Sequence, residues 1–227
     1  MSINLKKTLQ KVVNTKGLNG QKAQVVLCLD YSGSMDELYR SGFVQRLVER
    51  IVPVAVQFDD NGEMELYLFQ NGCKKHPSTI NEKNVDGLIK REIYGKYQFG
   101  GTAYAPAVKM ICEDFEPGKS FFSGQKPVDP VYVIFITDGE NSDHFQAESI
   151  IKAVCTKPVF FQFVGIGNAT FSFLDKLDTM SGREIDNANF FQINDLDRVS
   201  DEELYEKLLT EFPQWLNVVK SRGIVKE

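Results

Sequence analysis

Apolar residues occur along the chain in short continuous runs, a pattern typical of strands that are buried on both faces of a parallel sheet. The three clearest runs are Ala23–Leu29, Val131–Thr137 and Val159–Val164. Two shorter segments, Met64–Phe69 and Asn189–Ile193, also have the composition of strands. The pattern therefore predicts a sheet whose central strands are covered on both sides.

One pair of strands is expected to run antiparallel. The dipeptide Asn71-Gly72 follows the strand Met64–Phe69 directly and is a strong signal for a tight hairpin turn. A short return strand near Cys73 would then lie at an edge of the sheet.

Segments with helical periodicity separate the strands. We expect helices at 2–14, Asp36–Gln57, Asn84–Ile93, Tyr104–Phe115, Phe145–Cys155, Phe171–Met180 and Asp201–Val219. Pro53 predicts a kink in the second helix and Pro213 a break in the last one. The polar, proline- and glycine-containing stretch Pro117–Pro130 is expected to be a surface loop.

Alternation of strands and helices predicts an α/β fold: a doubly wound, mainly parallel central sheet flanked by helices on both faces, with one antiparallel edge hairpin. We expect residues 1–227 to form a single domain with a core at about 22–195. The N-terminal helix at about 2–14 and the C-terminal helices at about 200–222 would pack on that core.

Composition narrows the function classes. The chain has 227 residues, 42% of them hydrophobic and 25% charged, and a net charge of −5, so no broad cationic surface for nucleic acid is expected. The sequence contains no run of about 18 apolar residues, so no membrane span is expected. The start lacks the apolar stretch of a signal peptide, and the four cysteines are widely separated, so we expect a cytoplasmic protein with reduced thiols.

Oxygen-bearing side chains follow the ends of the predicted strands. Asp30 and Asp138 each come directly after a buried run, and Ser32 and Ser34 follow Asp30 at alternate positions. Thr102 follows a pair of glycines and adds a third hydroxyl. Because the carboxyl ends of parallel strands meet at one edge of a sheet, these side chains can converge there. Carboxylates and hydroxyls are hard donors that suit Mg²⁺ better than zinc.

Together the Asp-x-Ser-x-Ser segment, the Gly-Gly-Thr loop and the Thr-Asp-Gly segment resemble the metal-ion-dependent adhesion site of von Willebrand factor A (vWA) domains, and the resemblance covers most of the chain. It implies a doubly wound fold and one Mg²⁺ site, with Mn²⁺ or Ca²⁺ as substitutes. It also implies that a protein partner offers a Glu or Asp carboxylate to the metal. The implied metal ligands are Asp30, Ser32, Ser34, Thr102 and Asp138.

Two further segments, Phe58–Glu63 and Gly101–Pro106, are similar to bacterial tellurium-resistance (stress-response) proteins and, more distantly, to copines. Such relatives often have asparagine where this chain has Ala103. The resemblance implies a metal-dependent adaptor or scaffold in a stress or toxic-ion response, rather than an enzyme.

Two alternatives remain open at this point. The first is a Mg²⁺-dependent phosphohydrolase, although Ser32 stands where such enzymes carry a second aspartate. The second is a structural subunit whose metal only stabilises the fold. The two histidines, His76 and His144, are expected to be exposed, with His144 at the edge of the metal crevice.

Glycines and aromatic residues near the predicted site have plainer explanations. Gly165-Ile166-Gly167 lacks the third glycine of a dinucleotide-binding motif and is interpreted as a tight turn between a strand and a helix. The aromatic residues around Thr102 are expected to lie partly in the core and partly at the rim of the site; they are Tyr94, Tyr97, Phe99 and Tyr104.

Overall fold

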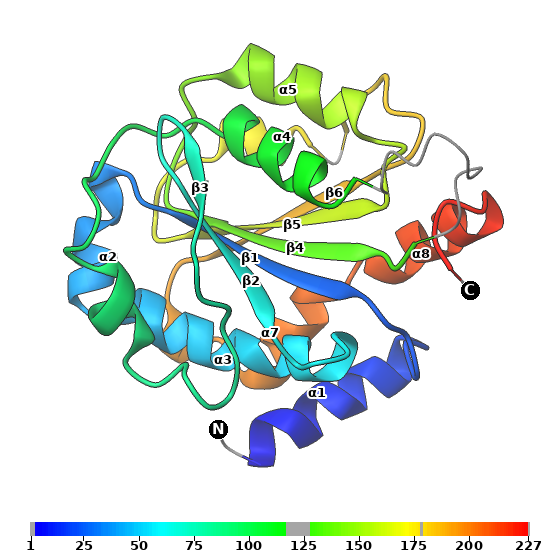
Figure 1. Cartoon of the computed structure of the whole chain (residues 1–227), viewed down its shortest axis with the longest axis horizontal. Coiled ribbons are helices and arrows are strands. Elements are labelled where there is room, and N and C mark those ends of the chain that lie inside the picture. Colours follow the sequence, from blue (N-terminus) through cyan, green and yellow to red (C-terminus); the bar gives the residue numbers. More distant parts are fainter. Residues whose placement is uncertain (1–2, 117–127, 178, 227) are drawn as a thin grey trace.

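A computed structural model describes residues 3–116, 128–177 and 179–226 of the chain (Figure 1). Six strands form one sheet in the order β3-β2-β1-β4-β5-β6, and β3 alone runs antiparallel to its neighbour. The strands are β1 Gln24–Asp30, β2 Met64–Phe69, β3 Cys73–Lys75, β4 Val131–Thr137, β5 Val159–Ile166 and β6 Ala188–Ile193. The mainly parallel sheet with one antiparallel edge hairpin confirms the predicted fold class.

The strand order reverses between β1 and β4. The chain proceeds from β1 to β2 and β3 on one side, then crosses to β4 and continues outward to β6 on the other. β1 and β4 are parallel neighbours, with Leu29 opposite Ile136. Their carboxyl ends therefore meet at the switch point of the sheet, which is where α/β proteins of this kind bind ligands.

Helices cover both faces of the sheet (Figure 1). One face carries α1, α3, α7 and α8, and the other carries α4, α5 and α6. The helices are α1 Ile3–Thr15, α2 Asp36–Arg40, α3 Phe43–Phe58, α4 Ala105–Asp114, α5 His144–Ala153, α6 Ser172–Asp175, α7 Asp201–Leu208 and α8 Phe212–Ser221. Short 3₁₀ turns occur at Gly33–Met35 and Leu196–Arg198, and a π-helical turn at Ile89–Ile93.

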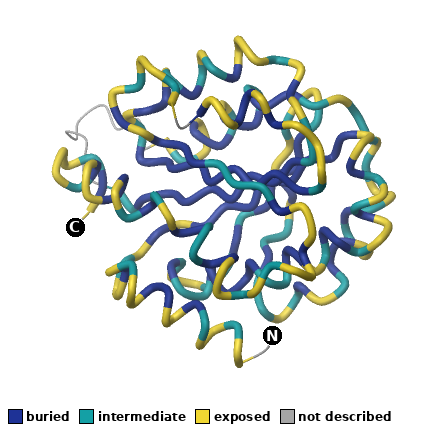
Figure 2. The backbone as a smooth tube through the Cα atoms, turned by 180° about the vertical axis from the view of Figure 1, so that it is seen from behind, coloured by how far each residue is buried: buried dark blue, intermediate teal, exposed yellow. Residues whose placement is uncertain are grey.

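Alternate residues of each central strand supply two separate hydrophobic cores. In β1, Val25 and Leu27 face the core beneath α1 and α3, whereas Val26 and Cys28 face the core beneath α4 and α5. Figure 2 shows the central strands buried along nearly their whole length, with exposed positions on the outer sides of the helices. This burial on both faces explains the continuous apolar runs of the sequence. No helix in the described part of the chain has both the length and the apolar character that crossing a bilayer requires.

The predicted single helix Asp36–Gln57 is wrong, because it is two helices. Gly42 has φ of +76° and separates α2 from α3. This left-handed conformation is readily adopted by glycine, which has no Cβ, and it turns the chain between the two helices. Pro53 lies within α3, which continues to Phe58.

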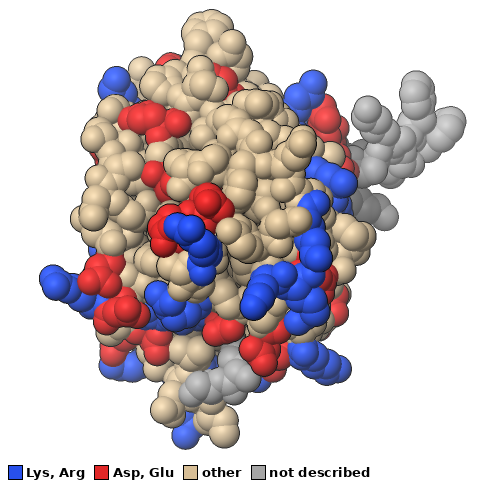
Figure 3. Space-filling view, turned by 90° about the vertical axis from the view of Figure 1, so that its left-hand side faces the viewer, with Lys and Arg blue, Asp and Glu red and all other residues tan. Residues whose placement is uncertain are grey.

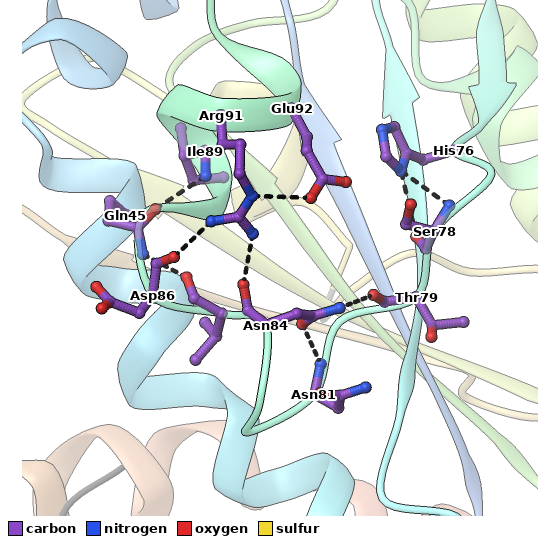
Figure 4. A network of polar contacts seen from close by, with 11 residues as sticks. Gln45, His76, Ser78, Thr79, Asn81, Asn84, Asp86, Ile89, Arg91 and Glu92 are labelled. Carbon is purple, nitrogen blue, oxygen red and sulfur yellow. Dashed lines mark hydrogen bonds and ion pairs between the residues drawn. The ribbon is translucent and has the colours of Figure 1, made fainter.

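The predicted helix Asn84–Ile93 is also wrong except for the π-helical turn at its end. Side chains hold this segment in place of a regular backbone ladder (Figure 4). Arg91 donates to the carbonyl oxygens of Asn84 and Asp86, each at 2.8 Å. From α3, Gln45 accepts from the backbone N–H of Ile89 at 2.9 Å. The periodicity that suggested a helix is thus satisfied by packing against α3.

His76 was expected to be exposed and is buried instead. Its side chain lies close to Ser78, whose backbone N–H donates to its Nδ1 at 3.1 Å (Figure 4). An imidazole can make such local hydrogen bonds while its ring packs against apolar neighbours, here Tyr97. The single residue type did not reveal this environment.

The C-terminal elements agree in part with the pattern. α7 and α8 are separate, and Pro213 lies in the first turn of α8, so the predicted break is confirmed. The helix expected over Phe171–Met180 is limited to the short α6. The excursion Pro117–Pro130 lies outside the described residues apart from its last three positions.

Gly165 has a packing role rather than the role in a turn that the sequence suggested. It belongs to β5, and a Cβ at this position would lie 2.7 Å from the ring of Phe171. The following Gly167 does adopt a left-handed φ of +83°. Only the second of the two glycines is therefore explained by chain reversal.

Candidate metal site

Asp30 is the last residue of β1 and is completely buried. Its Oδ1 accepts a hydrogen bond from the backbone N–H of Ser32 at 2.7 Å. Its Oδ2 accepts from the hydroxyl of Thr137, at the end of β4, at 2.6 Å. The carboxylate is therefore fixed between the two central strands at the switch point.

A chain of hydrogen bonds joins this end of β1 to the end of β4. The hydroxyls of Ser32 and Ser34 lie 3.1 Å apart, and Ser34 donates to Oδ1 of Asp138 at 2.7 Å. Ser34 is exposed and Asp138 is half-buried, so the cluster opens from the buried Asp30 toward solvent. Four of the five residues implied by the sequence thus lie together.

Thr102 belongs to a loop that lies directly beside these residues. Gly33 donates its backbone N–H to the carbonyl oxygen of Gly100 at 3.0 Å, in a parallel bridge between Ser32 and Gly100. On the other side, Ser142 donates both its N–H and its hydroxyl to the carbonyl oxygen of Thr102, each at 2.8 Å. Within the described residues, the Thr102 hydroxyl makes no hydrogen bond to the other four side chains.

The two glycines before Thr102 permit a close approach to the β2–β3 hairpin. A Cβ at Gly100 would lie 1.5 Å from Oε1 of Gln70, and one at Gly101 would lie 2.4 Å from Oδ1 of Asn71. The backbone N–H of Ala103 also donates to the carbonyl oxygen of Gln70 at 2.8 Å. The Gly-Gly pair therefore leaves the space beside the loop into which the side chains of Gln70 and Asn71 extend.

Electrostatics at the site favour a bound cation. Burial, with a smaller contribution from the nearby charge of Asp138, raises the pKa of Asp30 to about 7, although its hydrogen bonds from Thr137 and Ser32 act to lower it. Burial also raises the pKa of Asp138. No Lys, Arg or His of the described chain lies within ion-pair distance of either carboxylate. A divalent cation would supply the missing positive charge.

Several residues that support the site were not assigned a role from the sequence. Thr137 donates to Asp30, and the buried Tyr104 donates from its hydroxyl to the carbonyl oxygen of Gly139 at 2.6 Å. Tyr39 of α2 donates to the carbonyl oxygen of Asp30 at 2.7 Å. Thr137 stands next to Asp138 in the Thr-Asp-Gly segment, so its position was the one available signal. The tyrosines reach the site only through the tertiary fold.

The aromatic residues around the loop lie as expected. Tyr104 is buried, whereas Tyr94, Tyr97 and Phe99 are half-buried, and the ring of Phe99 stacks on Tyr31 with centroids 4.4 Å apart. They form the wall of the loop that carries Thr102.

The second histidine, His144, lies at the start of α5, close to the loop that follows Asp138. His144 is exposed, as predicted, and its Nε2 lies 3.2 Å from a carboxylate oxygen of Glu140. Glu140 also accepts from the backbone N–H groups of Ser172 and Phe173 at the start of α6. These contacts connect the loop after Asp138 to the neighbouring helix.

The donors suit a hard cation. Two carboxylates and three hydroxyls are available, and no cluster of three or more His, Cys, Asp or Glu side chains occurs in the described residues. Mg²⁺ accepts a few protein oxygens and retains waters in its remaining positions. The residues present therefore fit such an ion.

Comparison with known proteins identifies the family of the chain. The family model described as the vWA found in the TerF C terminus matches residues 22–225. The Bacillus subtilis (strain 168) protein YcbR is 42% identical over 225 residues, which cover 98% of this chain and 89% of YcbR.

Solved structures of vWA proteins share the fold. BatB from Bacteroides thetaiotaomicron aligns with a TM-score of 0.57 and 15% identity, covering 88% of this chain and 99% of BatB. A von Willebrand factor type A protein from Catenulispora acidiphila aligns with a TM-score of 0.55 and 15% identity over 91% of this chain. The match spans 44% of the Catenulispora protein, less than half of its length.

Domains of this kind are generally metal-dependent protein-interaction modules and usually have no enzymatic activity. The link to TerF agrees with the expected similarity to tellurium-resistance proteins. The extent of the family match and the identity to YcbR together establish that the chain belongs to the TerF-like family of vWA domains.

Proposed function

We propose that this protein is a metal-dependent adaptor that binds Mg²⁺ at the cluster of Asp30, Ser32, Ser34, Thr102 and Asp138. The partner would be a protein that offers a Glu or Asp carboxylate to the metal. One observation carries the proposal: two carboxylates with raised pKa values converge with hydroxyls at the switch point, and no cationic side chain of the described residues pairs with them.

The choice of donors explains why an outside carboxylate would bind. Hydroxyls contribute no negative charge, and Asp30 is already engaged with Ser32 and Thr137. A cation with few direct anionic ligands keeps much of its attraction for a carboxylate from another molecule. Mn²⁺ and Ca²⁺ are possible substitutes because both also prefer oxygen ligands.

The membership of the TerF-like family supports a role in a bacterial stress response or in resistance to tellurite or other toxic ions. In that role the protein would act in the cytoplasm as a scaffold.

Replacing Thr102 with alanine tests the proposed function. We expect Thr102→Ala to lose Mg²⁺-dependent capture of partner proteins from a native lysate, relative to wild type and to a chelator control. The melting temperature in EDTA should stay close to that of wild type, because the Thr102 hydroxyl makes no hydrogen bond to the cluster. Affinity capture followed by mass spectrometry, and thermal unfolding, measure the two effects.

A matched substitution, Thr210→Ala beyond the end of α7, is the control. If Thr102→Ala lowers the melting temperature as well as the capture of partner proteins, the result would contradict the adaptor role and favour a structural metal. Turnover of a phosphate ester in Mg²⁺ that disappears in Asp30→Asn would favour the phosphohydrolase.

A further inference from the structure

An open groove of about 650 Å³ lies between α4 and α5, which pack side by side on one face of the sheet (Figure 1). α4 contributes Lys109 and α5 contributes Ser149 to its sides. The rest of its lining is mainly apolar, and the apolar residues are Ala103, Ala105, Pro106, Phe145, Ile150 and Ala153.

The groove begins at the candidate metal site. Ala103, at one end of it, follows Thr102 directly in the chain. Asp143 also lines it, and its carboxylate accepts from the backbone N–H groups of Tyr104 and Ala105 at 3.0 and 2.8 Å. Ser142 binds the carbonyl oxygen of Thr102, so the same two loops form the metal site and the end of the groove. The end of the groove is therefore next to the candidate metal site.

Phe145 is an exposed apolar side chain at this end of α5. It is 80% exposed, the highest value among the exposed large apolar side chains of the described residues. Figure 3 shows the face at the left of Figure 1, where β1 leads into α2. Its upper part, over α4 and α5, carries few charged side chains, whereas Lys, Arg, Asp and Glu gather in the lower part. Uncharged surface of this kind beside a binding site is a common feature of protein interfaces.

Charge along the groove selects the kind of partner. The carboxylate of Asp143 is occupied by the start of α4, whereas the Lys109 side chain is 65% exposed and lies 3.8 Å from Glu113, a loose pair. A bound metal at one end and Lys109 on one side both favour carboxylates. The apolar lining between them favours a bulky apolar side chain.

The length of the groove determines how far apart the acidic and the apolar residue of a bound segment can be. From Phe145 to Ala153, eight residues of α5 extend about 12 Å at the helical rise. About four residues of extended chain cover that distance. We infer that the groove binds a partner segment in which the metal-binding Glu or Asp is followed or preceded, within about four residues, by a large apolar side chain. This inference rests on the proposed function and names the partner sequence that the same site would select.

Selection from a phage-displayed library of random short peptides, in Mg²⁺ and in EDTA, tests the inference. We expect the Mg²⁺-dependent peptides to share an acidic residue with a large apolar residue within four positions. Ser149→Arg, which places a long side chain in the groove, and Phe145→Ala should weaken binding of such a peptide at least tenfold. Both side chains are on the surface of α5, so folding should not change.

The matched control is Ser221→Arg, the same change on α8 at the opposite face of the sheet. Calorimetric titration with Mg²⁺ should give equal metal affinity for wild type and all three variants. The inference would be overturned if the peptides selected in Mg²⁺ showed no preference for an apolar residue, or if Ser149→Arg bound them as wild type does. Neither result would contradict the proposed metal-dependent adaptor function.

Three other outcomes are also decisive. Enrichment of no peptide by a protein that binds Mg²⁺ would show that the groove takes no short linear segment. A Mg²⁺-dependent dimer that Ser149→Arg abolishes would show that a second copy of the chain occupies it instead. Absence of Mg²⁺ binding by wild type would contradict the proposed function itself.

Discussion

Replacement of Asp138 by alanine is expected to abolish the stabilisation of the protein by Mg²⁺. For wild type, Mg²⁺ at 100 times its Kd should raise the free energy of unfolding by about 2.7 kcal/mol, because the ion binds the folded state alone. Asp138 is one of two carboxylates at the site and accepts a hydrogen bond from the Ser34 hydroxyl. Without it, the ion loses a charged ligand and the position of Ser34 is no longer fixed. Urea unfolding in Mg²⁺ and in EDTA measures the difference.

The control for this experiment is Asp60→Ala. Asp60 lies before the amino-terminal end of β2, whereas the site lies at the carboxyl ends of the strands, and its exposed side chain pairs with Lys22. This variant should keep the full Mg²⁺ effect. A stabilisation by Mg²⁺ that persists in Asp138→Ala would place the ion elsewhere on the molecule.

Metal affinity is expected to increase with pH. With a pKa of about 7 in the metal-free folded protein, against an ordinary value of 3.8, Asp30 holds its proton through the weakly acidic range. Mg²⁺ must displace that proton, so its apparent affinity should rise about tenfold between pH 6 and pH 8. Calorimetric titration at the two pH values measures the change.

The same shift predicts how the metal-free protein responds to pH. Since the pKa of Asp30 is higher in the folded state, the stability from this group is fully present below about pH 4 and is lost as the pH rises through 7. Asp30→Asn should lack this loss. In EDTA, the free energy of unfolding in urea should therefore fall less between pH 5 and pH 8 for Asp30→Asn than for wild type. Equal Mg²⁺ affinity at pH 6 and pH 8 in wild type would show that the Asp30 carboxylate is not protonated in the free site.

The positions of the strands, and the residues at which the central strands end, could be predicted because burial on both faces determines their sequences. A strand buried on both faces must be apolar throughout, so Asp30 and Asp138 marked the ends of β1 and β4. Since parallel strands end at the same edge, the two carboxylates could be expected to lie together. The hydrogen bonds through Ser32 and Ser34 agree with that expectation.

Elements whose conformation depends on distant residues could not be predicted. The break at Gly42 did have a local signal, because Ser-Gly dipeptides are common in turns, but the helical spacing of apolar residues on both sides favoured one continuous helix. The segment before Ile93 has helical spacing, but contacts from Gln45 and Arg91 determine its path. His76 is buried by packing that no local pattern encodes.

The groove beside the metal site is a further property of the tertiary structure. Most of its residues come from the Thr102 loop, α4 and α5, and each is ordinary in its own segment. Phe145 fits the apolar pattern of α5, yet it lies outside the core. Sequence reasoning could therefore propose candidate metal ligands, but not the surface that would select a partner.

A crystal of this protein grown with Mn²⁺ and measured at the manganese absorption edge would test the central claim most directly. The account predicts one anomalous peak among the side-chain oxygens of Asp30, Ser32, Ser34, Thr102 and Asp138. Ordered binding of the ion at another place, or an ordered site that holds only water among these oxygens at saturating Mn²⁺, would contradict it.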